Sequence, residues 1–430
     1  MTQPVEGGDG APRRRGKLFL VSHNFPPTLG PESSLVRLNT IDLASRGWQV
    51  SVLTTTMEHM HQGLDFGMLD GLPEGLEIIR TPSYDAVLRK KWPRLGRIIL
   101  TLFHYYLVPE VFLLWLFSSV PEGKRWLAAN GPAILYSRAT KNVSNIAAGF
   151  LKRATGMPWV AHFSDPWVGD PLNAFQRWIA RQLEGRVFRD ADAVVIVGQK
   201  LADHILRLYP WARHKVHIIP HGYAPLAEKP APVQGAGTRP LNMIQAGSFL
   251  PGYREPDKLF EGLAILNARK PLAGRLKATF VGEDTKLYQD LANRLGIADV
   301  VELLSSVPYK QCQQMIAASD LLLVIDTPGA GGIYLPTKLI EYLAHEKPVL
   351  ALAEPESTIH EVVKECDLAF ADQNNPEEIA NTMEKLLAQW ESGSWAVSEA
   401  SKEGAARYRI DRLNSALDDL LCRFYERVAA

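Results

Sequence analysis

The stretch LLLVIDTPGAGGIYLPTKLIEYLAHEKPVLAL, residues 321–352, decides the fold of this chain. Its opening residues, 321–325, are all apolar and predict a buried strand, because the run is too short for a helix and turn residues follow it. The turn is rich in glycine, and Gly331 and Gly332 allow the backbone to approach a ligand without an intervening Cβ. A strand, a glycine turn and a helix in this order predict an α/β unit with a binding site at the turn.

A helix predicted over LPTKLIEYLAHEK, residues 335–347, follows this turn and offers groups for a phosphate and an adjoining sugar. Pro336 suits a first helical position, and Thr337 and Lys338 then fall in the opening turn, where backbone N–H groups and the helix dipole attract an anion. Lys338 adds a full positive charge. Glu341 lies one turn further on the same side and can reach hydroxyls of a sugar next to that phosphate. The pattern indicates a nucleoside diphosphate site, and the alternative is an ordinary loop and half-buried helix.

Length and composition favour a multidomain cytoplasmic protein. The 430 residues suggest about two or three domains, and a formal net charge of zero argues against nucleic acid as a partner. Three cysteines lie far apart without metal-type spacing, which favours reduced thiols: Cys312, Cys366 and Cys422. Residues 1–16 have no apolar segment after their basic residues, so we expect a disordered lead-in and no secretory signal.

Two α/β halves follow the lead-in. In the first, LFLVSHNFPP, SSLVRLNTIDLASRG and WQVSVLTTT predict a strand, a helix and a second strand, which implies a crossover in a parallel sheet. The second half repeats this order with LNMIQAGS, KATFVGED, LLLVID and PVLALAE. Pro, Gly and Ala accumulate between the halves, so we expect the domain boundary near residues 221–240. No G-x-G-x-x-G follows the first strand, which argues against a dehydrogenase.

An ordered set of motifs covers nearly the whole chain from Lys17 onward: FPPTLGPESSLVRL followed by ASRGWQVSVLT, then PWVAHFSDPW, ADAVVIVGQKLADHI with IIPHGY, and YLPTKLIEYLAHEKPVLAL. Together they resemble the GT-B glycosyltransferases, and among these the retaining family 4 type that uses a nucleotide-activated sugar. The resemblance implies two facing Rossmann-like domains with parallel sheets. Residues 17–221 would bind the acceptor and residues 222–404 the nucleotide sugar. A last helix over residues 405–428 would cross back to the first domain, so that residues 405–430 pack on it.

The chain departs from the family pattern at the donor site. The family has two glutamates separated by seven residues; Glu341 matches the second, which binds the donor ribose, whereas Ile333 stands in place of the first, which contacts the transferred sugar. Backbone N–H groups of the loop 329–334 are the alternative partners for that sugar. On the first loop of the second domain the usual cations are altered, and we expect Arg254 to bind the diphosphate; the alternative is a solvated loop arginine.

The expected chemistry explains these residue types. A sugar leaves a nucleoside diphosphate as an oxocarbenium-like species while negative charge builds on the phosphate, so fixed cations such as Lys338 and Arg254 stabilise the transition state. A metal or other cofactor is then not required, since the nucleotide sugar is itself a substrate. Asp190 and Asp192 form a D-x-D pattern, which we interpret as a structural helix-to-strand junction and not as a metal site.

Further candidates lie in the first half. Gly30, between two prolines and a helix, would let the chain pass close to the donor phosphates, and Arg37 lies about two turns into that helix, where it is either a phosphate ligand or a surface residue. His162 and Asp165 follow the strand in AHFSDPW. The resemblance implies that the histidine contacts the transferred sugar and that the aspartate orients or deprotonates the acceptor hydroxyl. The alternatives are a core histidine and an Asx turn.

A basic and then strongly apolar segment, residues 89–119, predicts a contact with a membrane surface. It contains Trp92 and Trp115, but Pro109 and Glu110 interrupt it, so an interfacial helix fits better than a spanning one. The alternative is packing within the first domain. If the contact exists, a lipid-linked acceptor at the inner face of the membrane is expected.

The sequence as a whole predicts a retaining glycosyltransferase that acts on a glycan acceptor in surface polysaccharide assembly, the last clause resting on family analogy. Two alternatives share the same donor site. One is a GT-B nucleotide-sugar epimerase or hydrolase, which uses no acceptor. The other is a catalytically silent GT-B module that binds a nucleotide sugar or a partner protein, an alternative raised by Ile333.

Overall fold

The computed structural model describes residues 15–57, 63–96, 98, 100, 110, 112–139, 141–167, 173–226, 235–252, 254–327 and 331–429. The chain divides into two compact units. The N-terminal unit consists of residues 1–197, 205–219 and 410–430, and the C-terminal unit of residues 198–204 and 220–409. Each unit has its own sheet and its own hydrophobic core.

In the described part of the N-terminal unit, seven parallel strands form one sheet in the order β3-β2-β1-β4-β5-β6-β7. The strands are β1 Gly16–Val21, β2 Trp48–Thr55, β3 Glu77–Thr81, β4 Ile134–Ala139, β5 Trp159–Phe163, β6 Ala193–Ile196 and β7 Val216–Ile218. Because the strand order reverses between β1 and β4, the carboxyl ends of these two strands mark the place where ligands bind in open parallel sheets.

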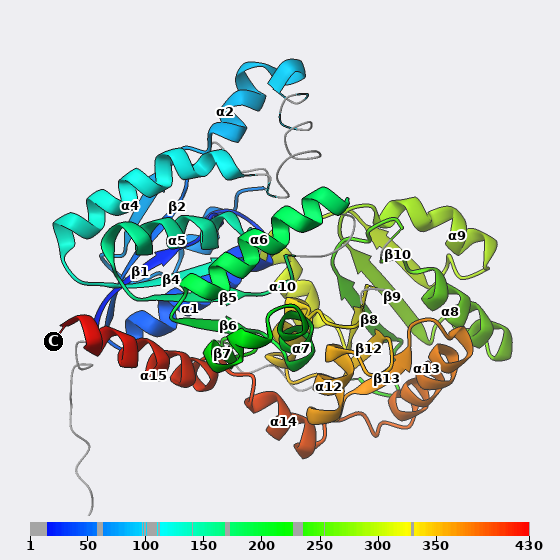
Figure 1. The fold of residues 1–430 in the computed structure, drawn as a ribbon. Helices are drawn as coiled ribbons and strands as arrows, with labels where there is room; N and C mark the ends of the chain where they lie inside the picture. Colours follow the sequence, from blue (N-terminus) through cyan, green and yellow to red (C-terminus); the bar gives the residue numbers. More distant parts are fainter. Residues whose placement is uncertain are drawn as a thin grey trace, which may run out of the picture. The chain divides into compact units, whose positions relative to one another are not determined.

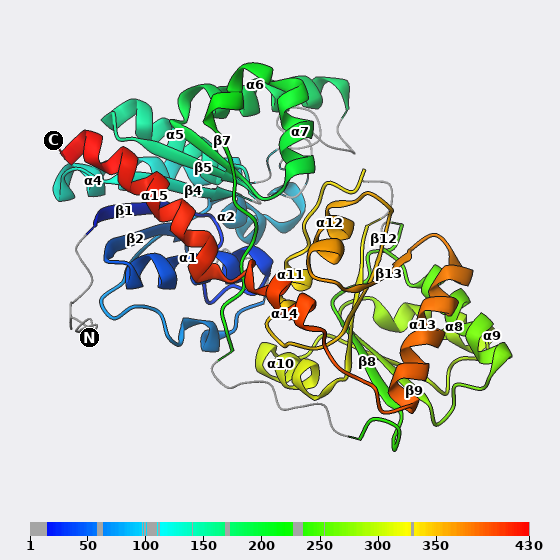
Figure 2. The same cartoon turned by 90° about the horizontal axis from the view of Figure 1, so that it is seen from below.

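Helices cover both faces of this sheet. Helices α1 and α15 lie on one face, and α4 and α5 lie on the other (Figure 1 and Figure 2). The helical segments are α1 Pro31–Ser45, η2 Phe66–Leu69, α2 Tyr84–Lys91, η3 Leu113–Trp115, α4 Leu116–Asn130, α5 Val143–Thr155, α6 Ala174–Asp190, α7 Gln199–Leu208, η4 Pro210–Lys215 and α15 Ile410–Ala429. Residues of α7 are divided between the two units.

The two ends of the N-terminal unit meet at α15. Asp418 of α15 accepts a hydrogen bond from Trp48 Nε1 at 2.7 Å and forms an ion pair with Arg15 at 3.1 Å. The expected lead-in over residues 1–16 is therefore too long at its end, because Gly16 already belongs to β1. The expected last helix from residue 405 is also wrong at its start, since α14 ends at Ala406 and α15 begins at Ile410.

In the described part of the C-terminal unit, six parallel strands form one sheet in the order β10-β9-β8-β11-β12-β13. The strands are β8 Leu241–Ala246, β9 Leu276–Val281, β10 Val301–Leu304, β11 Leu321–Ile325, β12 Val349–Ala353 and β13 Ala369–Asp372. Its helical segments are α8 Asp257–Arg269, η5 Thr285–Tyr288, α9 Gln289–Arg294, α10 Tyr309–Ala318, α11 Thr337–Leu343, α12 Thr358–Glu365, α13 Pro376–Glu391 and α14 Glu399–Ala406.

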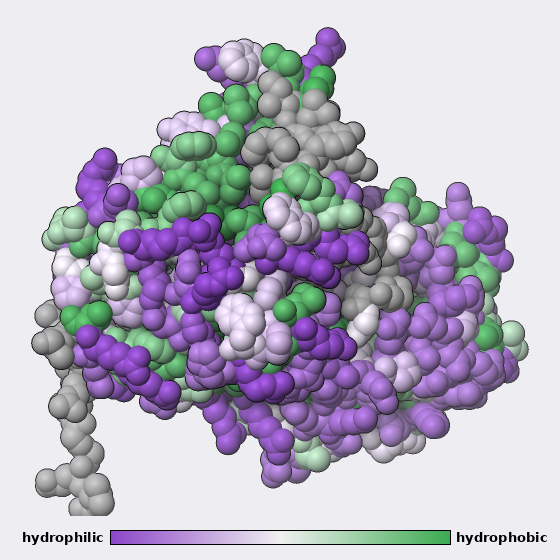
Figure 3. All heavy atoms as spheres, in the orientation of Figure 1, coloured by the Kyte–Doolittle hydropathy of each residue, from purple (hydrophilic) through white to green (hydrophobic). Residues whose placement is uncertain are grey.

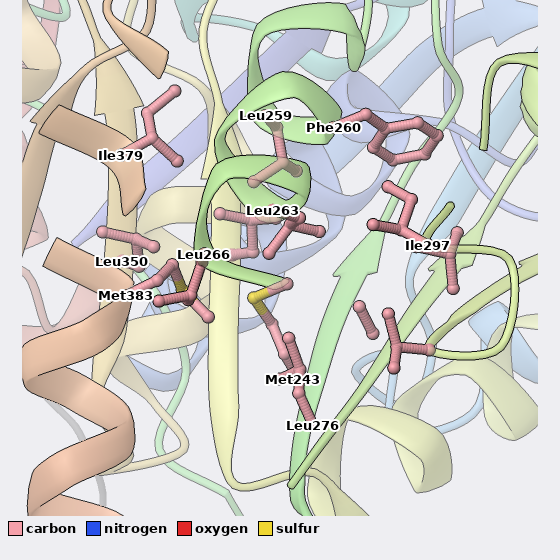
Figure 4. Close-up of a cluster of buried hydrophobic side chains, with 14 of the residues drawn as sticks. Met243, Leu259, Phe260, Leu263, Leu266, Leu276, Ile297, Leu350, Ile379 and Met383 are labelled. Atoms are coloured by element: carbon pink, nitrogen blue, oxygen red, sulfur yellow. The ribbon is translucent and has the colours of Figure 1, made fainter. Parts of the chain in front are cut away.

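The core of the C-terminal unit lies between the sheet and the helix pair α8 and α13. Leu263 of α8, Met383 of α13 and Met243 of β8 are buried in one cluster (Figure 4). The helices approach closely at Gly262, where a Cβ would lie 2.9 Å from the Pro376 carbonyl oxygen. The prediction of two Rossmann-like parallel-sheet units is thus confirmed.

Candidate functional site

The strand order of the C-terminal unit reverses between β8 and β11, which places the candidate site at the carboxyl ends of these strands. Gly247 follows β8, and Asp326 follows β11. The helix α11, which begins at Thr337, follows β11 along the chain. The strand and helix that the sequence predicted over residues 321–352 are therefore the elements that carry the site.

Lys338 of α11 reaches the end of β8. A Cβ placed on Gly247 would lie 1.4 Å from Lys338 Nζ, so the ammonium group occupies the space beside the glycine. Gly247 also packs against Gly282 after β9, where a Cβ would lie 2.4 Å from the Gly247 carbonyl carbon. Gly247 thus makes room for the half-buried Lys338, and any larger residue at position 247 would displace its ammonium group.

Arg254 and Glu341 share the surroundings of Lys338. Burial lowers the pKa of Lys338 to about 8; the charge of Arg254 lowers it too, and the charge of Glu341 opposes the shift. Burial raises the pKa of Glu341 to about 7, against the attraction of Lys338. The structure therefore brings together three of the residues that the sequence singled out. Cys312 of α10 also lies within electrostatic range of Lys338 and Glu341.

Arg254 sits on a short loop closed by two backbone hydrogen bonds of 2.8 Å with Leu250. Burial lowers the pKa of its guanidinium, against the opposing charge of Asp326. Among the described residues, neither Arg254 Nε nor the buried Gln245 Oε1 has a hydrogen-bond partner. Because buried polar atoms are rarely left without one, these atoms indicate a polar ligand at this end of the sheet.

Sequence reasoning did not single out Asp326 or Gln245. Asp326 is buried, and burial raises its pKa to about 6; its Oδ1 accepts a hydrogen bond from the Thr327 N–H at 2.8 Å. Gln245 is also buried, one residue before the end of β8. Both are polar residues at the carboxyl end of an apolar strand, and this pattern could have found them.

The glycine loop is attached to the start of α12. Thr358 donates from its backbone N–H and from its Oγ1 to the Gly332 carbonyl oxygen, at 2.7 Å and 2.9 Å. Gly332 has a φ of 61°, and a Cβ there would lie 2.6 Å from Ser357 Cβ, so only glycine fits. Gly331 is exposed beside it, with a φ of 66°. Residues 328–330 of the predicted loop lie outside the described residues.

The helix α11 differs from the prediction in two respects. Pro336 precedes the helix as its N-cap, so that Thr337 is the first helical residue. The helix has only seven residues and ends at Leu343, instead of continuing to residue 347. Since the dipole of so short a helix is weak, the side chains of Lys338 and Arg254 must carry most of any anion binding here.

In the N-terminal unit, Gly30 and Arg37 have different surroundings. Gly30 is the N-cap of α1 with a φ of 129°, which favours glycine, and Pro31 follows at the first helical position. The guanidinium of Arg37 donates to the backbone carbonyls of Met68, at 2.7 Å, and of Asp70. Arg37 therefore contacts the η2 turn through Nε and Nη2, and its contact with the donor phosphates stays a prediction.

A buried polar cluster surrounds His162 at the ends of β4 and β5. Arg138 and His162 are register partners on these strands. Arg138 Nε pairs with Glu32 Oε1 at 3.0 Å, and the Tyr136 hydroxyl lies 2.8 Å from His162 Nδ1. Ser164 Oγ lies 3.5 Å from the second oxygen of Glu32. The sequence predicted His162 alone; the signal for the others was a charged first turn after Gly30 and the polar end of the strand AILYSR.

Asp165 follows β5 and is half buried. Burial raises its pKa to about 6, the nearby charge of Glu32 raises it too, and Lys141 opposes the shift. Two residues further on, the backbone N–H of Trp167 donates a hydrogen bond to Glu184 Oε1 of α6 at 3.1 Å. A carboxyl group with a pKa near neutrality can both accept and release a proton under physiological conditions.

The segment 89–119 is only partly described. Contrary to expectation, Trp115 is fully buried, and its Nε1 donates to Thr81 Oγ1 at 2.9 Å. Glu110 is buried as well and accepts a hydrogen bond from the Val143 N–H at 3.1 Å. Trp92 is exposed. Among the described residues, none of the helices has the length and apolar character to span a membrane.

Both aspartates of the D-x-D pattern form ion pairs within the N-terminal unit. Asp190 pairs with Arg153 at 2.9 Å. Asp192 pairs with Lys152 and accepts a hydrogen bond from the Trp159 N–H at 2.7 Å. In the described ranges, no group of three or more histidine, cysteine, aspartate or glutamate residues is arranged to hold a metal ion.

The sequence matches two family models. Residues 41–222 match a model described as Glycosyl transferase 4-like domain, and residues 235–403 match a model described as Glycosyl transferases group 1. Among curated proteins, none matches the sequence significantly.

Solved structures show the same fold over nearly the whole chain. HepE (Alr3699) of Anabaena, in complex with UDP, is 14% identical with a TM-score of 0.63, covering 95% of this chain and 99% of its own. WaaG, a glycosyltransferase involved in lipopolysaccharide biosynthesis, is 16% identical with a TM-score of 0.55, covering 96% and 98%. The N-terminal domain of the Candida albicans trehalose-6-phosphate phosphatase is 11% identical with a TM-score of 0.65, covering 98% and 99%. With both halves matched by glycosyltransferase models and the fold shared throughout, this chain belongs to the GT-B glycosyltransferases.

Proposed function

We propose that this protein is a retaining, metal-independent glycosyltransferase, which moves a sugar from a nucleoside diphosphate sugar to a hydroxyl of a glycan or lipid-linked glycan. The observation that carries the proposal is the half-buried cation pair Lys338 and Arg254 beside Glu341, at the carboxyl ends of β8 and β11. Burying two like charges is unfavourable unless a counter-charge arrives. A diphosphate would supply it, and the ribose hydroxyls would then bond to Glu341.

The same groups account for the chemistry. As the bond between sugar and phosphate lengthens, negative charge develops on the departing diphosphate, and the positive charges of Lys338 and Arg254 would stabilise it. Because Gly331 and Gly332 have no Cβ, a sugar can approach their backbone N–H groups. These groups would hydrogen-bond to the sugar in place of the family carboxylate that Ile333 replaces. Gly30, at the start of α1, allows a close backbone approach to the donor phosphates. No step in this scheme requires a metal or another cofactor.

UDP and UDP-glucose are the first donors to test. HepE has been solved with UDP and with UDP-glucose, and the second complex is 16% identical to this chain with a TM-score of 0.61. WaaG takes part in lipopolysaccharide biosynthesis. These neighbours support a role in cell-surface polysaccharide synthesis. Asp165, with its pKa near 6, would orient or deprotonate the acceptor hydroxyl.

Calorimetric titration of the intact protein with UDP, GDP, ADP and their sugar conjugates tests the donor site. We expect one nucleotide to bind selectively, and Lys338→Met and Glu341→Gln to weaken that binding. Lys364→Met, an exposed lysine on α12, is the matched control and should bind as the wild type does. Equal binding by all three variants would place the donor elsewhere and refute the proposal.

A nucleotide-sugar epimerase or hydrolase would use the same site of Lys338 and Glu341, whereas the replacement of the first family glutamate by Ile333 favours a catalytically silent module. Incubation with the donor alone separates the two enzymes, because only the epimerase or hydrolase converts the donor without an acceptor. Selective binding without turnover over a broad acceptor panel would instead indicate a silent binding module.

A contact between the N-terminal unit and the inner face of the membrane is part of this proposal. Lys90, Lys91 and Arg94 are exposed beside the exposed Trp92. Hydrophobic atoms gather over the region of α2 and α4 (Figure 3). Basic charge next to exposed aromatic and aliphatic groups is typical of proteins that bind anionic lipid surfaces.

Co-sedimentation with phosphatidylglycerol vesicles tests this contact. Lys90→Gln with Lys91→Gln should weaken binding about thirtyfold, since each basic residue near an anionic surface contributes ~1 kcal/mol. Phosphatidylcholine vesicles should bind the protein little. Equal binding to both vesicle types, or to neither, would remove the membrane from the proposal and leave the donor site unaffected.

A further inference from the structure

Two polar groups contact the same ring nitrogen of His162, Nδ1. The Tyr136 hydroxyl lies 2.8 Å from Nδ1, and Arg138 Nη1 lies 3.5 Å from it. All three side chains are buried at the ends of neighbouring strands. The position of the imidazole proton therefore depends on which of these neighbours donates.

The arginine decides the direction of the hydrogen bonds. A guanidinium has only donors, so Arg138 cannot accept a proton from Nδ1. The Arg138 side chain also hydrogen-bonds the Tyr136 hydroxyl as a donor, and the O–H of that hydroxyl is available to donate to Nδ1. Burial raises the pKa of Tyr136, which keeps this proton on the phenol. Both neighbours thus present N–H or O–H groups to Nδ1, which must be the acceptor.

The carboxylate of Glu32 completes the arrangement. It lies in the first turn of α1 and pairs with Arg138 Nε at 3.0 Å, which fixes the plane of the guanidinium. Burial raises the pKa of Glu32, and the charge of Arg138 opposes that shift. A relay of hydrogen bonds therefore runs from Glu32 through Arg138 and Tyr136 to His162.

We propose that this relay fixes His162 as a neutral imidazole with its proton on Nε2, so that it donates a hydrogen bond to a substrate oxygen and does not act as the general base. Tyr136, Arg138 and Glu32 are positioning residues in this scheme. The inference rests on the proposed transferase function for the identity of the substrate, but the tautomer itself is a property of the free protein. It leaves Asp165 to orient or deprotonate the acceptor hydroxyl.

The charges around His162 act in opposite directions. Arg138 on β4 opposes a second proton on the ring, and the Tyr136 hydroxyl would have to turn from donor to acceptor to receive it. As anions, Glu32, which pairs with Arg138, and Asp165, three residues after His162, would favour a positive ring. Lys141, near Asp165, opposes one. Glu32 is already paired with Arg138, so the direct contacts at Nδ1 decide the outcome.

Nitrogen NMR on the full chain with ¹⁵N-labelled histidine tests the tautomer directly. The His162 signals are identified by their loss in His162→Gln. We expect Nδ1 at the chemical shift of an unprotonated nitrogen and Nε2 at that of a protonated one, unchanged between about pH 6 and 8, the range in which an unperturbed histidine titrates. A proton on Nδ1, or conversion to the imidazolium in that range, would overturn the proposal. This measurement needs no substrate, so it stands even if the transferase proposal fails.

Tyr136→Phe tests the relay. The variant keeps the ring volume but removes the donor, so we expect the Nδ1 signal to move towards the shift of a nitrogen without a hydrogen bond. A tyrosine that only supports the fold would change the melting temperature and leave this signal in place, which would contradict its role as a positioning residue.

Substitution of His162 gives a kinetic test once an acceptor is known. Glutamine can place an N–H near the position of Nε2, whereas asparagine is too short. We expect His162→Gln to retain transfer within about tenfold with an unchanged pH profile, because loss of a general base would cost roughly 10²- to 10⁴-fold. His162→Asn should lose considerably more. Equal and large losses in both variants, together with loss of the acidic limb of the pH profile, would show that His162 acts as a general base and would overturn the proposal.

Discussion

The polar groups of the N-terminal and C-terminal units are organised in opposite ways. Around His162, charges and hydrogen-bonding groups are paired with one another, as in the 3.0 Å ion pair between Glu32 and Arg138. Around Lys338, the neighbouring cation Arg254 lowers its pKa further, and Arg254 Nε has no partner among the described residues. The first arrangement fixes geometry, and the second is stabilised when an anion binds.

This difference has an energetic consequence. A buried ion pair is stable as long as both members are present, and loss of one leaves an uncompensated charge. Half-buried charges with shifted pKa values, such as those of Lys338 and Glu341, instead reduce the stability of the free protein. Substitution should therefore destabilise the first cluster and impair ligand binding in the second.

Arg138→Met should have the largest effect on stability. It leaves the carboxylate of Glu32 buried without its partner, and breaking a buried pair in this way costs about 3–5 kcal/mol. Urea unfolding of the free protein measures the loss. Glu32→Gln combined with Arg138→Met removes both charges and should recover a large part of it. If the single variant is as stable as the wild type, the pair does not support the N-terminal unit.

Lys338→Met should impair binding with little loss of stability. Removing one charge-assisted contact to the diphosphate should cost about 2–3 kcal/mol, or roughly 30- to 150-fold in the dissociation constant of the nucleotide. Calorimetry compares the variant with Lys364→Met, which is exposed and should bind normally. A variant that binds normally but unfolds easily would show that Lys338 has a structural role like that of Arg138.

The affinity for the nucleotide should fall above pH 8. The pKa of Lys338 is lowered to about 8 in the free protein, and a bound diphosphate raises it, so binding at higher pH requires uptake of a proton. The dissociation constant should then rise by up to about tenfold per pH unit. Titrations from pH 7 to about pH 9 measure this slope, and it should disappear in Lys338→Met. A flat profile in the wild type would mean that another group carries the charge.

The sequence predicted the carboxyl-end residues of the C-terminal unit better than those of the N-terminal unit. The C-terminal site residues lie in short segments that follow the neighbouring strands β8 and β11: Arg254, Lys338 and Glu341. Local patterns and the family resemblance were enough to identify them. The relay to His162 joins Glu32 to Arg138 over 106 positions. No local pattern encodes such a contact, because it depends on β4 lying beside both β1 and β5.

The elements that the sequence missed or misplaced have local physical causes. The strands β10 and β13 were not predicted, because each has four residues and includes a charged one, so that its apolar run is too short to be recognised. Trp115 was assigned to a membrane contact because its neighbours are apolar, but its indole finds a hydrogen-bond partner in Thr81 on the edge strand β3. Periodicity could not distinguish an inner from an outer apolar surface there.

Glu341→Gln should stabilise the free protein, which is the smallest effect and the sharpest test of the comparison. Burial raises the pKa of Glu341 from 4.5 to about 7, so the folded state disfavours the carboxylate, and this cost is present above pH 7 and absent below 4.5. The variant removes that cost but also removes the anion beside Lys338, so we expect a net gain of only ~1 kcal/mol at pH 8. Unfolding in urea at pH 8 and at about pH 5 should show the gain shrinking as the carboxyl group becomes protonated in both states. Saturating nucleotide should reverse the order, because the wild type gains more from binding. A variant that is less stable than the wild type at pH 8 without nucleotide would mean that Glu341 and Lys338 support the fold as a pair, and the distinction between the two units would be lost.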